Sequence, residues 1–224
     1  MPPMDASLSV LQKILLWAVP VLIAVVFHEL AHGYVAYRLG DSTAARAGRL
    51  TLNPIAHIDL FGTIIMPLLL VVSGAPFLFG YAKPVPVNFL NLRSPRRDMI
   101  LVALAGPGMN LLLAGFAALA LHFFLLPAVQ SSTGGGAAAL GLLVTARIMY
   151  SFVLMNVGLA VFNMLPLPPL DGGRVATGLL PQTPAMALAR LEPYGIVIIL
   201  LLVSTGKLDP LLRPITSFLL NVLL

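Results

Sequence analysis

Long apolar stretches joined by short polar connections dominate the pattern of this chain. Three of them, at about 8–39, 99–126 and 137–164, exceed the roughly 20 apolar residues that a membrane-spanning helix needs. Two further stretches, 194–203 and 211–224, are apolar but short. The pattern therefore predicts an all-α polytopic membrane protein with about four to six membrane segments.

Segment 62–79 is apolar but interrupted by Pro67, Gly74 and Pro76, and basic residues lie on both sides of it. Because Lys and Arg concentrate in cytoplasmic loops, a single crossing would put one basic flank outside. One transmembrane helix that departs from this rule is one interpretation. We favour a re-entrant hairpin that turns near 73–76, since such backbone is tolerated where protein or a wet cavity surrounds it.

The two stretches that flank this segment, 48–58 and 83–92, alternate apolar and polar positions and contain prolines. Proline is compatible with the edge of a sheet but not with its centre. We therefore expect short edge strands at the cytoplasmic interface.

The basic residues set the orientation of the three long helices. They follow the first helix, precede the second and follow the third, whereas loop 127–136 carries no charge. By the positive-inside rule the first helix ends in the cytoplasm, the second leaves it and the third returns. The expected location is the cell membrane, with multiple spans.

Composition narrows the class of protein and the chemistry open to it. Hydrophobic residues make up 59% of the chain and charged residues 9%, which excludes an ordinary soluble domain. The net charge of +5 suits contact with anionic lipid rather than nucleic acid. With no cysteine, any metal must be held by nitrogen and oxygen. We expect one domain over 1–224, with a core at about 8–175 and accessory membrane segments at about 190–224.

The first long helix contains His28-Glu29-Leu30-Ala31-His32, which has the pattern H-E-x-x-H. Four residues are about one helical turn, so both imidazoles lie on one face and can bind one metal ion, with Glu29 beside it to accept a proton from water. Ionisable groups inside an apolar helix are costly and point to function. A histidine–glutamate cluster that only joins helices, or a helix end at the interface, remains the alternative.

A hydrolytic zinc site needs a third protein ligand, and Asp171 is the candidate among the remaining acids. It lies in Asn163-Met-Leu-Pro-Leu-Pro-Pro-Leu-Asp-Gly-Gly173, directly after the third long helix. Its prolines stop the helix, and Gly172 and Gly173 permit a sharp turn and close packing. The predicted topology puts Asp171 and His32 on the same, cytoplasmic side.

These motifs, together with Gly106-Pro107-Gly108-Met109-Asn110 in the second long helix, resemble the site-2 protease family of intramembrane zinc metalloproteases. The likeness covers roughly Val19 to Arg174. Many members carry a further helix before the H-E-x-x-H helix, or a PDZ or CBS domain, and we expect none of these here. The resemblance therefore implies a compact prokaryotic type.

The family resemblance implies a three-helix catalytic core and a set of roles. It makes His28, His32 and Asp171 the ligands of one Zn²⁺ per chain, and Glu29 the general base. The reaction is hydrolysis of a peptide bond in a substrate's transmembrane segment. The expected partners are the lipid bilayer and a single-pass membrane protein or leftover signal peptide, with no nucleic acid.

Three further residues are candidates for holding substrate or an oxyanion. The position of Asn163 matches the family's asparagine, although a hydrogen bond between helices explains it equally well. Asn110 belongs to the G-P-x-x-N element and is expected to tie the middle helix to its neighbours. His57 lies with Asp59 in N-P-x-x-H-x-D, a stretch seen in compact members, although a turn role is more common.

Two rival functions come from other classes. A membrane metal-ion carrier would use the same ligands but would usually show inverted repeats, which the sequence lacks. An inactive relative would act as a scaffold, and the presence of Glu29 beside both histidines argues against it. The sequence leaves open the substrate, the oligomeric state and the number of spans after Arg190.

Overall fold

The computed structural model describes residues 14–74, 80–132 and 136–224, and in these residues every regular element is helical. Four helices are long and apolar enough to cross a membrane: Leu16–Arg38, Pro95–Ser131, Ala137–Asn163 and Gln182–Ser204. The three predicted long helices are confirmed. The fourth includes the short apolar stretch 194–203 and begins earlier than the pattern suggested.

The first and second long helices are composite. A π-helical turn, Ile14–Ala18, leads into α2 (Val19–Arg38). Helix α5 (Pro95–Ala120) continues through a π-helical turn, Leu121–Leu125, into α6 (Leu126–Ser131). Pro107 lies inside α5, which transmembrane helices tolerate because neighbouring groups satisfy the freed backbone.

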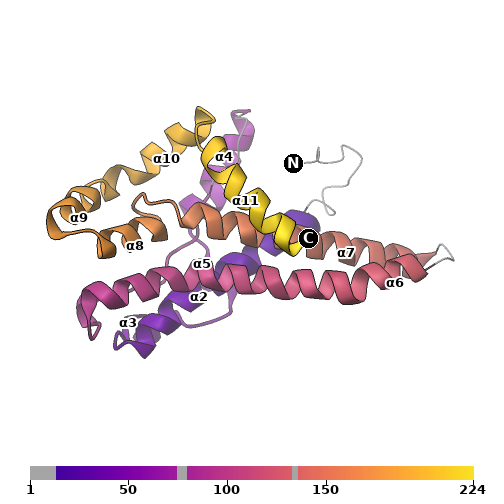
Figure 1. The fold of residues 1–224 in the computed structure, drawn as a ribbon, viewed down its shortest axis with the longest axis horizontal. Coiled ribbons are helices and arrows are strands. Elements are labelled where there is room, and N and C mark those ends of the chain that lie inside the picture. The colour runs from indigo at the N-terminus through magenta and orange to yellow at the C-terminus, as the bar shows by residue number, and fades with distance from the viewer. Residues whose placement is uncertain (1–13, 75–79, 133–135) are drawn as a thin grey trace.

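Helices α2, α5 and α7 (Ala137–Asn163) form the centre of the molecule. Helix α5 packs against both others, and α2 also contacts α7 (Figure 1). Small side chains of α5, among them Ala114 and Ala118, meet Val153 and Val157 of α7. Small residues let helices approach closely where no hydrophobic effect drives association. Helices α2, α5 and α7 thus form a three-helix bundle, and its role as a catalytic core stays a prediction.

The C-terminal third covers one end and one side of this bundle. After α7 a short arm leads into α8 (Asp171–Leu179), which packs on α5. Helix α9 (Gln182–Ala189), a 3₁₀ turn at Glu192–Tyr194 and α10 (Gly195–Ser204) follow. Helix α11 (Asp209–Leu223) then lies along α7 and contacts α5.

The segments at 48–58 and 83–92 are not strands in the described residues. The first contains a 3₁₀ turn, Pro54–His57, and the second ends in another, Phe89–Asn91. Tyr81, Lys83 and Val85 do donate their N–H groups as alternate residues of an extended chain. Their acceptors are scattered, on Gly62, His57 and a side chain, so no ladder forms. The expectation of edge strands was wrong because extended backbone needs a second regular strand to pair with.

The described ends of the interrupted apolar segment, 62–79, lie close together. A π-helical turn, Leu60–Ile65, leads into α4 (Met66–Val72). The chain then comes back so that the Tyr81 N–H donates to the Gly62 carbonyl at 3.1 Å. Both ends of the segment therefore lie together, an arrangement that supports the re-entrant interpretation. Residues 75–79, which include part of the predicted hairpin turn, lie outside the described part of the chain.

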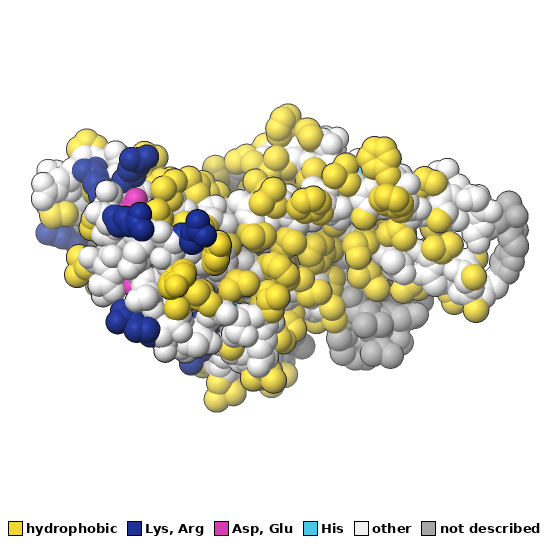
Figure 2. All heavy atoms as spheres, turned by 90° about the horizontal axis from the view of Figure 1, so that it is seen from below, with side chains coloured by type: hydrophobic (Ala, Val, Ile, Leu, Met, Phe, Trp, Pro, Cys, Tyr) yellow, Lys and Arg dark blue, Asp and Glu magenta, His cyan; other side chains and the backbone are white. Residues whose placement is uncertain are grey.

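Charge is distributed unevenly over the surface. Lys and Arg side chains gather at one end of the molecule, which in Figure 1 is the end of α8, α9 and α3 (Thr43–Arg46). Hydrophobic side chains cover most of the rest of the same face (Figure 2). A lipid-embedded body with one basic end fits a multi-pass membrane protein.

Candidate metal centre

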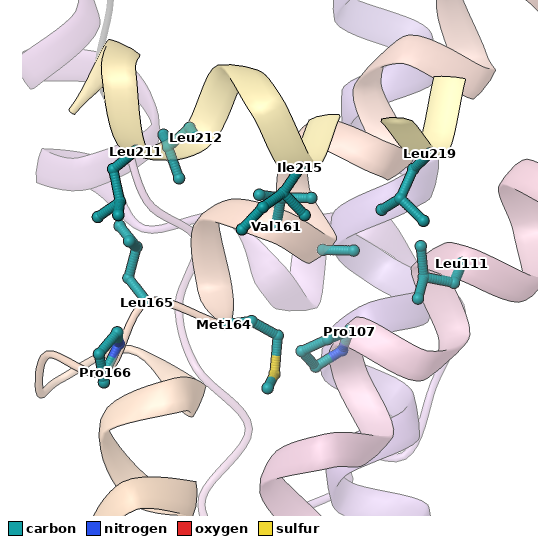
Figure 3. Close-up of a pocket in the computed structure, with 11 residues that line it drawn as sticks. Pro107, Leu111, Val161, Met164, Leu165, Pro166, Leu211, Leu212, Ile215 and Leu219 are labelled. Atoms are coloured by element: carbon teal, nitrogen blue, oxygen red, sulfur yellow. The ribbon is translucent and has the colours of Figure 1, made fainter. Parts of the chain in front are cut away.

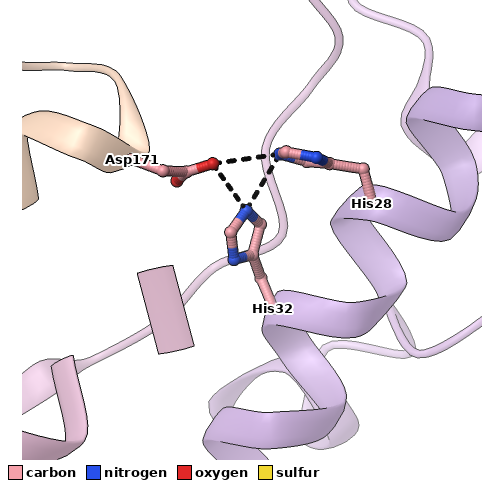
Figure 4. A group of neighbouring side chains, drawn as sticks. All are labelled: His28, His32 and Asp171. Atoms are coloured by element: carbon pink, nitrogen blue, oxygen red, sulfur yellow. Dashed lines mark hydrogen bonds and ion pairs between the residues drawn. The ribbon is translucent and has the colours of Figure 1, made fainter. Parts of the chain in front are cut away.

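Three buried side chains from two helices converge on one point (Figure 4). His28 and His32 lie one turn apart on α2, and their Nε2 atoms are 3.0 Å from each other. Asp171, the first residue of α8, places Oδ2 at 3.1 Å from His28 Nε2 and 3.2 Å from His32 Nε2. The three predicted ligands therefore form a nearly equilateral triangle of one carboxylate and two imidazole atoms.

Hydrogen bonds on the outer side of each imidazole leave its inner nitrogen free to bind a cation. His28 donates Nδ1–H to Asn110 Oδ1 at 2.6 Å, and His32 donates Nδ1–H to the Val102 carbonyl at 2.7 Å. A neutral imidazole that donates from Nδ1 carries its lone pair on Nε2. Such outer partners fix the tautomer and orientation of metal-binding histidines.

Asn110 belongs to a buried network between three helices. Its Nδ2 donates to the Ala24 carbonyl of α2 and to Oδ1 of Asn156 on α7. Asn156 in turn donates to the Phe152 carbonyl. Because the Asn110 amide is fully buried and uses its oxygen and nitrogen in this way, it acts on His28 rather than facing open space.

The three atoms have the chemistry and the spacing of a cation site. All three are hydrogen-bond acceptors, and Asp171 Oδ2 has no hydrogen-bond donor among the described residues. Converging lone pairs repel one another unless a positive charge lies between them. Ligand atoms about 2.0–2.2 Å from a tetrahedral zinc ion lie roughly 3.3 Å apart, close to the separations here. Two histidines and a carboxylate suit zinc and leave one position open.

Gly106 of α5 lies directly against the two histidine rings. A Cβ atom at position 106 would collide with Nε2 of His32 and lie 2.6 Å from Nε2 of His28. Any side chain here would therefore displace the two imidazoles. The glycine in Gly-Pro-x-x-Asn is required by this close approach.

The arm between α7 and α8 is packed so closely that two glycines are needed. A Cβ on Gly172 would collide with the Met164 and Leu165 carbonyls, and one on Gly173 with the Pro168 nitrogen. Helix α8 therefore starts directly beneath the proline-rich arm. This packing fixes the position from which Asp171 reaches the histidines.

Glu29 is held by the extended segment that follows α4. Its Oε2 accepts the Val85 N–H at 2.8 Å. Val85 is buried, and a Cβ on Gly33, one turn after Glu29, would come within 2.7 Å of its Cγ1 atom. Pro84 and Pro86 lack N–H groups, so Val85 is the donor of this tripeptide.

Asp41 and Arg49 hold this extended segment against the end of α2. Arg49 donates to the Lys83 carbonyl at 3.0 Å, and Asp41 Oδ2 accepts the Asn88 N–H at 2.7 Å. Asp41 Oδ1 accepts from Thr43 and from Asn91 Nδ2. Burial opposes ionisation, but these hydrogen bonds outweigh it and lower the pKa of Asp41 below its ordinary value.

Two of the sequence candidates do not contact the triangle. Asn163 donates to the Leu159 carbonyl of its own helix. His57 is buried, with Nε2 bonded to the Thr51 carbonyl. Asp59 accepts the Gly62 N–H and so caps the helical turn that follows it. Roles for Asn163 and His57 in binding substrate stay predictions.

Sequence reasoning missed the groups that hold Glu29 and His32. Both are main-chain atoms, the Val85 N–H and the Val102 carbonyl, and main-chain groups leave no trace in residue identity. The alternation Lys-Pro-Val-Pro-Val at 83–87 was a usable signal, because it isolates single donors along one edge. Asp41 carried no signal beyond its position after a helix.

A family profile and individual related sequences both identify this chain as similar to metalloproteases. The profile of "Peptidase family M50" matches residues 16–203. A Bacillus subtilis protein named "Putative zinc metalloprotease YwhC" is 40% identical over 189 residues, which cover 84% of this chain and 79% of that protein.

Mycobacterial relatives are more distant. Proteins named "Putative zinc metalloprotease Rip2" from Mycolicibacterium smegmatis and Mycobacterium tuberculosis H37Rv are 31% and 32% identical. In each case the match covers 84% of this chain and 66% of the relative. No solved structure matches the chain.

Proposed function

The chain belongs to peptidase family M50 and is a zinc metalloprotease, and we propose that it hydrolyses a peptide bond in or near the transmembrane segment of a membrane-protein substrate. The substrate is a single-pass protein or a leftover signal peptide. The observation that carries this proposal is the burial of His28, His32 and Asp171 within a bundle of membrane-spanning helices. A centre at that place suits a peptide bond brought to it within the bilayer.

His28, His32 and Asp171 hold the zinc ion, one per chain, through Nε2, Nε2 and Oδ2. Zinc bound there supplies Lewis-acid chemistry toward water and toward the carbonyl of a peptide bond. The observed acceptor triangle and the two Nδ1–H donations support this assignment.

Glu29 is the general base. It directly follows His28 on α2, on the same helix turn as the ligands. It accepts a proton from the attacking water and returns it to the leaving amine. The Val85 N–H holds one of its oxygens and so limits the rotation of the carboxylate. Asn110 and Val102 position the histidines, and Asn163 and His57 remain the candidates for contact with substrate.

The active site lies toward the cytoplasmic side of the membrane. Support comes from the basic end of the molecule, toward which α8 runs from the site, and from the basic residues after α2. We propose one domain over 1–224, and the packing of α10 on the arm and of α11 on the central helices supports it.

The test compares three full-length proteins in detergent: wild type, Glu29→Gln and Asp171→Ala. We expect about one zinc in wild type and in Glu29→Gln, and a sharp loss in Asp171→Ala. Cleavage of a synthetic single-span peptide, followed by mass spectrometry, is expected only from wild type.

Each other outcome overturns a part of the proposal. Cleavage by Glu29→Gln would remove Glu29 as the base. Cleavage of soluble peptides but of no single-span peptide would remove the intramembrane substrate. Zinc transport into liposomes by Glu29→Gln at the wild-type rate, without proteolysis by wild type, would establish the carrier.

A further inference from the structure

A cavity of about 240 Å³ lies between α5, the end of α7 and α11 (Figure 3). Every residue that lines it is apolar. Its volume exceeds the roughly 150 Å³ that hold a benzene ring in an apolar protein cavity. It is too small for a helix, which is about 10–12 Å across with its side chains. One large aliphatic or aromatic side chain fits.

The inner wall of this cavity consists of direct neighbours of residues at the metal centre. Pro107 follows Gly106, the residue on which the two imidazoles rest. Met164 and Leu165 also line the cavity, and their carbonyls pack on Gly172, directly after Asp171. The cavity thus includes the residue next to Gly106 on α5 and two residues that pack against the start of α8.

We propose that this cavity receives one large apolar side chain of the substrate, from a residue next to the peptide bond that is cut. The proposal rests on the function given above and adds a specificity pocket to it. A transmembrane segment consists mostly of such side chains, which matches the apolar lining. Pro107 and the residues at 164–166 set the inner boundary.

Helix α11 forms the outer wall and therefore sets the size of the pocket. Ile215 and Leu219 contribute to it, and no residue of α11 is fully buried. Substitutions on this helix change the pocket without touching the zinc ligands. Val222, on the same helix, does not line the cavity and is 69% exposed, so it offers a matched control.

The first experiment measures side-chain preference. Zinc-loaded full-length protein cleaves single-span peptides that differ only in the residue beside the cut bond: Ala, Leu or Phe. For wild type we expect kcat/KM for Leu or Phe to exceed that for Ala by about 10-fold or more. Ile215→Trp, which fills the pocket, abolishes this preference, and Ile215→Ala shifts it toward Phe. Val222→Trp retains the wild-type ratios.

Wild-type ratios in both Ile215 variants would overturn the pocket and leave a lipid acyl chain as the occupant of the cavity. A second readout needs no cleavage. The chain has no cysteine, so Ile215→Cys in the Glu29→Gln protein gives a unique thiol. We expect a disulfide with a cysteine scanned through the peptide, at one position only, and none from Val222→Cys.

The two readouts separate the two hypotheses. If no peptide is cleaved, the proposed function fails, and the crosslink alone decides whether the pocket holds a substrate side chain. Absence of any crosslink from Ile215→Cys to the scanned peptide would overturn the pocket even where cleavage occurs.

Discussion

At the scale of single residues, the metal centre depends on one missing side chain. Gly106 leaves room for both imidazoles, and a methyl group there would displace them. We expect Gly106→Ala to lower zinc affinity at least as much as loss of an outer partner, about 10–100-fold. Competition with a fluorescent zinc chelator measures this.

Gly108→Ala is the matched control for this prediction. It lies two residues further along the same helix, and a Cβ there meets nothing within 4 Å. We expect wild-type zinc affinity and a slightly more stable helix. Equal zinc affinity for the two alanine variants would contradict the close approach that the structure shows.

Asp41 gives a prediction about pH. Its pKa is lowered in the folded protein, so the stabilisation it provides is present above its ordinary pKa of 3.8 and is lost as the pH falls through the lower folded value. Asp41→Asn is therefore expected to lower stability by about 1 kcal/mol at pH 7. Thermal unfolding in detergent should show this difference shrinking below about pH 4.

Asp209 provides the comparison for this measurement, because it is exposed at the start of α11. Asp209→Asn should leave the melting temperature unchanged at both pH values. A constant difference between wild type and Asp41→Asn from pH 7 to pH 3 would show that the charge of Asp41 contributes nothing.

The residues also show what a sequence reveals about a site. The spacing of His28 and His32 implies a shared face because helical geometry is local. The proline-rich arm before Asp171 indicates that its carboxylate is held in one place. The contacts from the Val102 carbonyl and the Val85 N–H depend on segments that are 70 and 56 residues away. No local sequence pattern indicates which main-chain group will contact His32 or Glu29.

At the scale of elements, the C-terminal helices are coupled to the metal centre. Gly195, the first residue of α10, packs so closely on Pro168 and Pro169 that a Cβ would collide with the Pro168 carbonyl. That turn precedes Asp171 by two residues. We expect Gly195→Ala to destabilise the fold by about 1–3 kcal/mol and to weaken zinc binding.

Zinc titration of the purified variant measures this coupling, with Gly141→Ala on α7 as control, since a Cβ there meets open space. Wild-type zinc affinity in a destabilised Gly195→Ala protein would mean that α10 supports the fold but not the arm.

At this scale the prediction of edge strands was wrong. Alternation at 48–58 and 83–92 predicted strands, and the donors at Tyr81, Lys83 and Val85 show extended backbone just before and at the start of the second stretch. It could not indicate that their partners would be single acceptors on a helix, a turn and a side chain. The existence of a strand depends on a neighbour, whereas the long helices are set by their own composition.

At the scale of the whole molecule, the gathering of basic side chains at one end predicts its orientation. Single cysteines in this cysteine-free chain test it in intact cells. Gln130→Cys, near the uncharged loop, should react with a membrane-impermeant maleimide from outside. Ala47→Cys, after α3, should react only once the cells are permeabilised. The reverse labelling would invert the proposed topology.

The distance along the chain between the proposed ligands determines when the centre is completed. Asp171 follows His32 by 139 residues. At a synthesis rate of about 5–20 residues per second, the two histidines exist for roughly 7–28 s before their third partner is made. Throughout that interval the ribosome-bound chain has the H-E-x-x-H helix but no complete metal site. We therefore expect the newborn protein to be inert toward neighbouring nascent chains, and zinc loading to follow translation.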